Sequence, residues 1–171
     1  YSSVSSVAVY RREGLWVSMN NQVVQDETFH SQQWYRNFRQ KSVRWLPAHT
    51  DDVEMRIRNN PHPVVSMLMP IGSFEPSLAP SVLKVNVSAD YFLEPLNRIH
   101  LGESGTIYLL NQDGEPMLSQ AAYDTSAKAQ SEVKAAQADW RKQGVVYFVN
   151  DKGQRQIMVY KKLALTDWML V

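Results

Sequence analysis

The sequence of 171 residues contains no cysteine. Without thiols the chain cannot form a disulfide, a thiolate zinc site, an iron–sulfur cluster or a cysteine nucleophile. Cytosolic proteins usually keep a few thiols, whereas many exported bacterial domains have none. The absence of cysteine therefore favours a place outside the cytoplasm.

Long apolar runs and an excess of one charge are also missing. No stretch of about 18 apolar residues occurs, so no segment of this sequence is predicted to cross a bilayer. The 18 Lys and Arg residues nearly balance the 17 Asp and Glu residues. This net charge of +1 argues against a nucleic-acid partner, which would need a strongly basic surface. The chain begins without Met, directly in a strand-like segment, and we expect any signal or transmembrane segment to lie outside it.

Known catalytic signatures are absent too. The sequence has no G-x-S-x-G nucleophile elbow, no P-loop and no G-x-G-x-x-G fingerprint. A glycosidase would need an acidic pair that only the fold could assemble. His49, Asp51 and Asp52 have a spacing that a metal could use, but a solvated loop is the expected state of this segment. We expect no enzyme activity, no metal and no cofactor in this domain.

Aromatic residues and glycine-terminated strands are what the sequence does contain. Five Phe, five Trp and eight Tyr are enough to build one sizeable core or two modest ones. Three β-rich runs are each followed by a short polar stretch and a glycine: Gly14, Gly114 and Gly153. Glycine can adopt the positive φ that a tight hairpin needs, so this pattern predicts three hairpins.

The spacing of apolar residues predicts three helices. They are expected from residue 26 or 28 to about 40, from 124 or 126 to about 143, and from about 88 onward. In the second helix, Trp140 belongs to the apolar stripe, and Gly144 is expected to end the helix in a left-handed conformation. Pro95 is expected to kink the third helix or divide it into two short pieces.

The remaining β-rich segments give both halves of the chain the same order. They are expected at 4–10, 15–17, 43–46, 64–69 and 81–87, and then at 107–110, 115–118, 145–149, 156–163 and 168–171. Each half therefore reads strand, strand, helix, strand, strand, strand. This order predicts an α+β fold of two tandem units, each an antiparallel sheet with a flanking helix. The units are expected at 1–88 and, with the connecting helix, at 89–171.

The order of elements in each half resembles a PAS-like unit, and two such units joined by a helix resemble the double Cache sensor domain. Five segments carry the resemblance: Trp34–Tyr35, 64–71 with its Pro–hydrophobic end, 82–88 leading into the connecting helix, the Gly-x-x-Gly and Asp-Gly stretch 102–114, and the closing strand 165–171. The resemblance covers nearly the whole chain. Within the family, the chain is most similar to the sensors of histidine kinases that are paired with AraC-type regulators. The long N-terminal helix of the family is missing, and Pro95 within the connecting helix is a second departure.

The resemblance implies an extracellular sensor domain of a bacterial membrane-bound signalling protein. A small molecule, with carbohydrate-related compounds as candidates, would bind in the membrane-distal unit, and a conformational change would pass across the membrane. The full-length protein would be a homodimer, tethered by flanking helices and without a nucleic-acid partner for this domain. The alternative is a transmission module that binds a partner solute-binding protein in place of a small ligand.

The candidate ligand-binding residues are Trp34, Tyr35, Arg44, Trp45 and Met67. A ring face can stack on a sugar or an apolar ligand, and a guanidinium can bind a carboxylate or a hydroxyl. The alternative is that the two tryptophans are core residues of the first unit. Family members that sense amino acids have an arginine two positions before the tryptophan. Gln32 occupies that position here, which argues against an amino-acid ligand.

Overall fold

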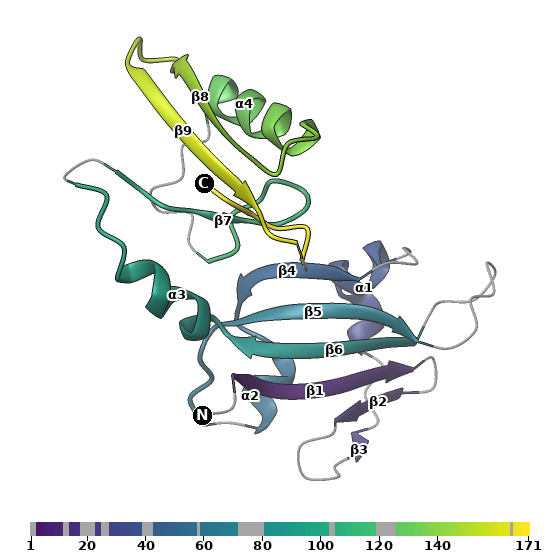
Figure 1. The fold of residues 1–171 in the computed structure, drawn as a ribbon. Helices are drawn as coiled ribbons and strands as arrows, with labels where there is room; N and C mark the ends of the chain where they lie inside the picture. The colour runs from purple at the N-terminus through teal and green to yellow at the C-terminus, as the bar shows by residue number, and fades with distance from the viewer. Residues whose placement is uncertain are drawn as a thin grey trace. The chain divides into compact units, whose positions relative to one another are not determined.

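The computed structural model describes residues 3–11, 14–17, 23–24, 28–38, 43–57, 59–71, 81–102, 105–118, 126–164 and 166–171. The chain divides into two compact units, Tyr1–Tyr91 and Phe92–Val171. Each unit contains an antiparallel sheet and helices (Figure 1), which confirms the predicted α+β class. None of the helices in the described ranges is long and apolar enough to cross a membrane.

The sheet of the first unit has six strands in the order β3-β2-β1-β6-β5-β4. Their bounds are β1 Val4–Arg11, β2 Gly14–Val17, β3 Val23–Val24, β4 Arg44–His49, β5 Val64–Ile71 and β6 Ser81–Ser88. All neighbouring strands are antiparallel. The first long strand and the last therefore lie side by side in the middle of the sheet. Alternating valines in β1 and β6 suit such a two-faced position.

The predicted first helix is two short elements in the described residues. A 3-10 helix, η1, covers Thr28–Ser31, and α1 covers Gln33–Asn37. The extended backbone of Gln32, with φ −69° and ψ 137°, separates them. Phe38 ends α1, because its ψ of 76° leaves the helical region and its N–H donates to the Tyr35 carbonyl. The expected end near residue 40 lies outside the described residues. A further helix, α2 at Asp52–Ile57, has no counterpart in the prediction.

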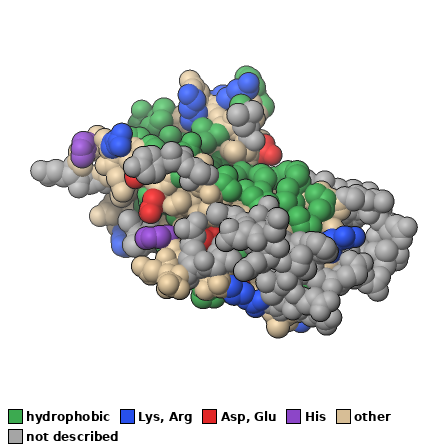
Figure 2. Space-filling view, turned by 90° about the horizontal axis from the view of Figure 1, so that it is seen from below, with side chains coloured by type: hydrophobic (Ala, Val, Ile, Leu, Met, Phe, Trp, Pro, Cys, Tyr) green, Lys and Arg blue, Asp and Glu red, His purple; other side chains and the backbone are tan. Residues whose placement is uncertain are grey.

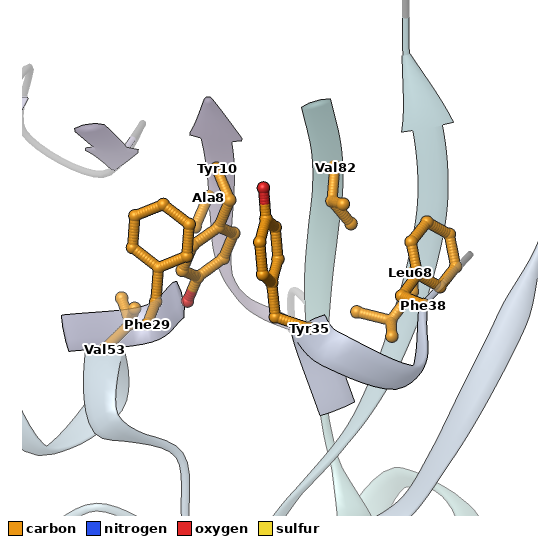
Figure 3. Packing of buried hydrophobic residues seen from close by; sticks show 8 residues of the cluster. All are labelled: Ala8, Tyr10, Phe29, Tyr35, Phe38, Val53, Leu68 and Val82. Carbon is orange, nitrogen blue, oxygen red and sulfur yellow. The ribbon is translucent and has the colours of Figure 1, made fainter. Parts of the chain in front are cut away.

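Aromatic side chains form the core between these helices and one face of the sheet. Figure 3 shows the rings of Tyr10, Phe29 and Tyr35 close together, with Val82 and Leu68 on neighbouring strands. Tyr10 and Tyr35 each lie edge-on to Phe29, with ring centroids 5.0 Å apart. These contacts hold η1 and α1 over the sheet face that carries Tyr10.

The second unit has a four-stranded sheet in the order β7-β10-β9-β8. Its strands are β7 Leu109–Leu110, β8 Gln143–Val149, β9 Arg155–Lys162 and β10 Met169–Leu170, and its helix α4 covers Ala127–Ala138. The Ser126 hydroxyl accepts from the Ala129 N–H at 3.3 Å, so the predicted cap of this helix is confirmed. The stripe of Ala129, Val133 and Ala136 is buried, and its last two members pack in the core with Leu110.

Two details of the helix predictions are wrong, and a third is narrowed. Asp139 leaves the helical conformation with a ψ of 137°, so α4 ends before Trp140, which is 90% exposed. Gly144 lies in β8 and does not end α4. Among the described residues, the glycines with a positive φ are Gly102, Gly114 and Gly153. Pro95 lies inside one helix, α3 at Ala89–Asn97, so the expected division into two short pieces does not occur, whereas the expected kink stays a prediction.

The hairpin glycines follow the prediction where the structure describes them. Gly114 and Gly153 have φ values of 80° and 77°, which favour glycine over any other residue. Gly14 opens β2 and pairs with Arg11 across the first hairpin. The repeated pattern of strand, polar turn and glycine therefore identified real turns.

Gly144 is needed for a different reason, the close approach of a side chain. It lies directly across from Tyr160 in the β8–β9 pair. A Cβ on Gly144 would lie 2.7 Å from atoms of the Tyr160 ring, which is itself only 2% exposed. We expect Gly144→Ala to lower the free energy of unfolding by about 1–3 kcal/mol through overpacking. Chemical denaturation would measure this, with Gln143→Ala at the exposed neighbouring position as the control. Equal stability of the two variants would contradict the expectation.

Hydrophobic side chains also reach the surface of the molecule (Figure 2). In the second unit, one face of the β8–β9 pair carries five of them, which are 51–76% exposed: Val145, Tyr147, Val149, Ile157 and Val159. The alternating residues Val146 and Met158 belong to the core of the second unit. The two strands are therefore apolar on both faces. An antiparallel sheet with one face in solvent usually has polar side chains on that face.

Candidate functional site: a buried polar cluster in the first unit

A row of polar side chains crosses the sheet of the first unit. Asn86 on β6 pairs with Ser6 on β1 and with Ser66 on β5. The Ser66 hydroxyl donates to the Asn86 Oδ1 at 2.6 Å, and the Asn86 Nδ2 donates to the Ser6 hydroxyl at 3.0 Å. All three residues are at most 1% exposed. The row lies on the face that carries the aromatic core, because Ala8 and Tyr10 follow Ser6 at alternate positions of β1.

Asp51 lies directly before α2 and connects this row to a buried cation. Its Oδ1 accepts from the Val53 N–H at 3.0 Å and from the Asn86 Nδ2 at 2.9 Å. Its Oδ2 accepts from the Lys84 Nζ. Asp51 and Lys84 are both only 2% exposed, so the ion pair is shielded from water. A pair of this kind is retained only where additional hydrogen bonds satisfy the carboxylate, as they do here.

Glu54 and His49 complete the polar cluster, which we define as Ser6, His49, Asp51, Glu54, Ser66, Lys84 and Asn86. The Glu54 carboxylate accepts from the Ser6 hydroxyl and is 1% exposed. The His49 side chain, 30% exposed, has its Nε2 3.5 Å from the Asp51 Oδ2 and 3.4 Å from the Ser66 hydroxyl. His49 is therefore the member that reaches the surface.

The solvated loop expected around His49, Asp51 and Asp52 is wrong. His49 ends β4, Asp52 begins α2, and Asp51 between them is buried by its bonds to Lys84 and Asn86. Within the described part of the chain, no group of three or more His, Asp or Glu residues is arranged to hold a metal ion.

Two aromatic rings cover the buried ammonium. The Lys84 Nζ lies 4.6 Å from the centroid of the Trp34 ring and 6.0 Å from that of Tyr10. The two rings contact each other edge to face, with centroids 4.9 Å apart. A cation held over the face of a tryptophan is attracted by the ring quadrupole, most strongly where water is excluded. We call Asp51, Trp34 and Tyr10 together the cation cage.

The orientation of Trp34 is fixed by Gln32, two positions before it in the chain. The indole N–H of Trp34 donates to the Gln32 side-chain oxygen, and the Gln32 amide donates to the Asp52 carboxylate. These two bonds satisfy the polar edge of the indole. Its face is thereby left to contact the Lys84 ammonium.

The structure distributes the five candidate ligand-binding residues over both sides of the sheet. Trp34 and Tyr35 lie in α1, where burial raises the pKa of the Tyr35 hydroxyl. Arg44 pairs with the core residue Leu68. Trp45 pairs with Met67, and strand alternation places both on the sheet face opposite Leu68. The structure therefore does not bring Trp45 and Met67 to the cation cage. The ligand roles of all five residues stay predictions.

Sequence reasoning missed the polar cluster itself. The available signal was the strand at 82–88, where Lys84 and Asn86 interrupt a run of valines at alternate positions. This pattern reads as a polar outer face, so it predicts solvent and not burial. Two polar residues at alternate positions of a central strand can equally indicate a buried network, as they do here.

Asp51 gives the stability of the first unit a specific dependence on pH. Burial alone would raise the pKa of Asp51, but the bonds from His49, Lys84 and Asn86 and the charge of Lys84 lower it well below its ordinary value of 3.8. A lowered native pKa means that the ionised group stabilises the fold. This contribution is complete above about pH 5 and is lost as the pH falls through 4 and below.

We therefore expect Asp51→Asn to flatten the loss of stability below about pH 4. Urea denaturation at a series of pH values would measure it, with Asp90→Asn at an exposed helix position as the control. An unchanged acid limb in Asp51→Asn would contradict the expectation.

The second unit contains a separate cavity of about 190 Å³. Its lining is mostly apolar and comes from α3 and from the chain around β7, including Leu93, Leu96, Ile107, Leu109, Pro116 and Leu118. Asn97, Thr106 and Tyr108 also line this space. The cavity therefore differs in chemistry from the polar cluster of the first unit.

No protein-family model matches the sequence, and no curated protein matches it either. Solved structures do match the fold. The ligand-binding domain of the Campylobacter jejuni chemoreceptor Tlp3, in complex with 4-methylisoleucine, is similar with a TM-score of 0.55 and 12% identity over 98% of this chain. The ligand-binding domain of Mlp24 with asparagine is similar with a TM-score of 0.54 and 12% identity over 98% of this chain. The extracellular domain of rpHK1S-Z16, described as a histidine kinase, is similar with a TM-score of 0.53 and 12% identity, again over 98% of this chain.

These comparisons define the class of the fold. The chain has the fold of the extracellular sensory and ligand-binding domains of chemoreceptors and histidine kinases. It spans 63% of the length of the Tlp3 chain, 66% of the Mlp24 chain and 69% of the rpHK1S-Z16 chain. An identity of 12% concerns the fold and not the ligand, because one fold can carry many different sites.

Proposed function

We propose that this chain is the double Cache ligand-sensing domain of a bacterial transmembrane signalling protein, and that a small molecule binds in its first unit beside Trp34. The observation that carries the proposal is the polar cluster beneath Trp34 and Tyr10, with its buried ion pair between Asp51 and Lys84. A purely structural sheet face would be apolar there, because a buried ion pair is rarely more stabilising than apolar packing.

The chemistry of the cluster suits the recognition of a small polar molecule. Convergent donors and acceptors beside an aromatic surface are what small-ligand sites generally combine. Trp34 is half-buried and His49 is 30% exposed, so the cluster adjoins the surface at these two residues. The structural neighbours include domains solved with 4-methylisoleucine and with asparagine, which supports a small ligand without identifying it.

The signalling part of the proposal concerns the whole protein. The domain would lie on the extracellular side of the membrane, have no catalytic role of its own, and act as a homodimer within a two-component or chemoreceptor system. A ligand shifts the signalling state only if it binds the two conformations of the domain with different affinities. Pairing of the protein with an AraC-type regulator is part of the same proposal.

Isothermal titration of the wild-type domain against sugars, amino acids and small organic acids would test the proposal. We expect one of these classes to bind, and we expect Trp34→Ala to weaken that binding at least tenfold, because the variant removes the ring beside the cluster. Tyr91→Ala, at an aromatic residue that is 59% exposed in α3, is the control and should bind as the wild type does. Binding that is equal in the two variants would exclude Trp34 from the site.

A partner solute-binding protein is the alternative to a small ligand. One observation, the buried cation, favours it. The Lys84 ammonium already occupies the space against the Trp34 ring, as a ligand group would. If no small molecule binds, titration with solute-binding proteins of the same organism would decide whether the domain transmits a signal from such a partner.

A further inference from the structure

The cation cage has the composition of a binding site for an organic ammonium ion. Its three walls are the Asp51 carboxylate, the Trp34 ring at 4.6 Å and the Tyr10 ring at 6.0 Å. A carboxylate beside aromatic faces is the arrangement by which proteins recognise ammonium groups of ligands. In this chain the cage contains an ammonium group already, and the chain itself supplies it from β6.

The packing of the sheet does not require a lysine at position 84. Its strand neighbours on the same face are Val82 and Asn86, and its cross-strand partners are Ala8 and Leu68. An apolar residue at position 84 would continue the core formed by Ala8, Leu68 and Val82. The lysine instead carries a charge into a site with 2% exposure, where only the cage compensates for lost hydration.

The bound ammonium has donor capacity in excess of its contacts. An ammonium has three N–H donors. Among the described residues, the Lys84 Nζ donates to the Asp51 Oδ2 alone, and two ring faces cover it. The Glu54 carboxylate bonds to Ser6 at the far end of the polar row. A ligand that approaches Lys84 would therefore meet a positive charge with hydrogen-bond donors.

We propose that Lys84 is a built-in occupant of a cation-binding cage and thereby determines the specificity of the first unit. Because the Lys84 ammonium fills the cage, the amino group of a ligand cannot enter it, whereas a small carboxylate can accept from the N–H donors that Lys84 does not use on Asp51. This inference rests on the proposed function for its ligand. The cage and its internal cation can be tested without that ligand.

The experiment empties the cage and refills it from solution. Lys84→Ala removes the last three methylene groups and the ammonium and leaves Asp51, Trp34 and Tyr10 in place. We expect n-propylammonium chloride to raise the melting temperature of Lys84→Ala in proportion to the logarithm of its concentration, as a ligand of the native state does. Neither 1-propanol nor sodium chloride should have this effect. The wild type and Lys161→Ala, at an exposed lysine of β9, should not respond to the amine.

A double variant isolates the carboxylate. Lys84→Ala with Asp51→Asn keeps the cavity and removes its negative charge, so the stabilisation by n-propylammonium should disappear. A folded Lys84→Ala that responds no more than the wild type would overturn the proposal. So would an equal response to 1-propanol, which would show an apolar cavity with no preference for a cation.

Lys84→Met keeps the proposal falsifiable if Lys84→Ala does not fold, because methionine nearly conserves the volume of the stem. Titration with amino acids and with their deaminated acids, such as isoleucine and 3-methylpentanoate, should show at least a tenfold preference of the wild type for the acid. Lys84→Met should lose this preference. Tighter binding of the amino acid to the wild type would contradict the exclusion of amines. If n-propylammonium stabilises Lys84→Ala but no titrated compound binds the wild type, the internal cation is supported and the proposed small-ligand function fails.

Discussion

Replacing Asp51 with alanine is expected to lower the free energy of unfolding by about 3–5 kcal/mol, because the variant leaves the Lys84 ammonium buried without its counter-charge. The same change removes one of the two acceptors of the Asn86 amide and the carboxylate that accepts from the Val53 N–H at the start of α2. Asp51 thus supports the cation cage, the polar row and α2 at once. Chemical denaturation followed by circular dichroism would measure the loss.

Asp90→Ala is the matched control for this prediction. Asp90 is an aspartate in the first turn of α3, but its side chain is exposed. Its removal should cost less than about 1 kcal/mol, the usual contribution of an exposed acid near a helix N-terminus. If Asp51→Ala were as stable as Asp90→Ala, the buried ion pair would make no net contribution. Restoration of stability in Asp51→Ala by a second change, Lys84→Met, would show that the unpaired ammonium causes the loss.

Leu110→Ala is expected to destabilise the second unit by about 2–5 kcal/mol. Leu110 is fully buried in the core of that unit, together with Val133 of α4 and Met169 of β10. The substitution removes three carbon atoms from a place where strand and helix meet, and the cavity that remains adds to the lost transfer energy. Denaturation followed by the fluorescence of the buried Trp168 in the same unit would measure it.

Leu101→Ala is the matched control in the second unit, because the same residue type is 50% exposed there. Its effect should stay within about 0.5 kcal/mol, as for most surface substitutions. A Leu110→Ala variant that unfolds at the wild-type denaturant concentration would mean that β7 is not part of the cooperative core.

The fold was largely predictable from local patterns, and the site was not. Strands such as β1 and β6 have alternating apolar residues, and the glycine turns at Gly114 and Gly153 follow from the conformational freedom of glycine. The cap at Ser126 is equally local. These features depend on residues that are close in the sequence, so the sequence order contains them.

The polar cluster depends on contacts that no local pattern shows. Ser6, Asp51 and Asn86 are joined by hydrogen bonds across separations of 35 and 80 residues. Their burial follows from strand register, and a shift of one residue would turn Lys84 to the other face. The prediction that Trp140 belongs to the buried stripe of the helix was wrong for a related reason. Its spacing continues the helical pattern, but Asp139 ends the helix before it.

The central pairing of β1 with β6 also sets the order in which the first unit can fold. Ser6 meets Asn86 only after the chain has been made to the end of the unit, and the two strands form the middle of the sheet. Contacts so distant in sequence slow folding, because loop closure precedes any stabilising contact. The β1–β2 hairpin can form early, but the ion pair of Lys84 forms only after the last strand, β6, has been made. A chain released or cut before residue 88 would therefore carry an unfinished sheet edge, which makes the first unit prone to aggregation until β6 is in place.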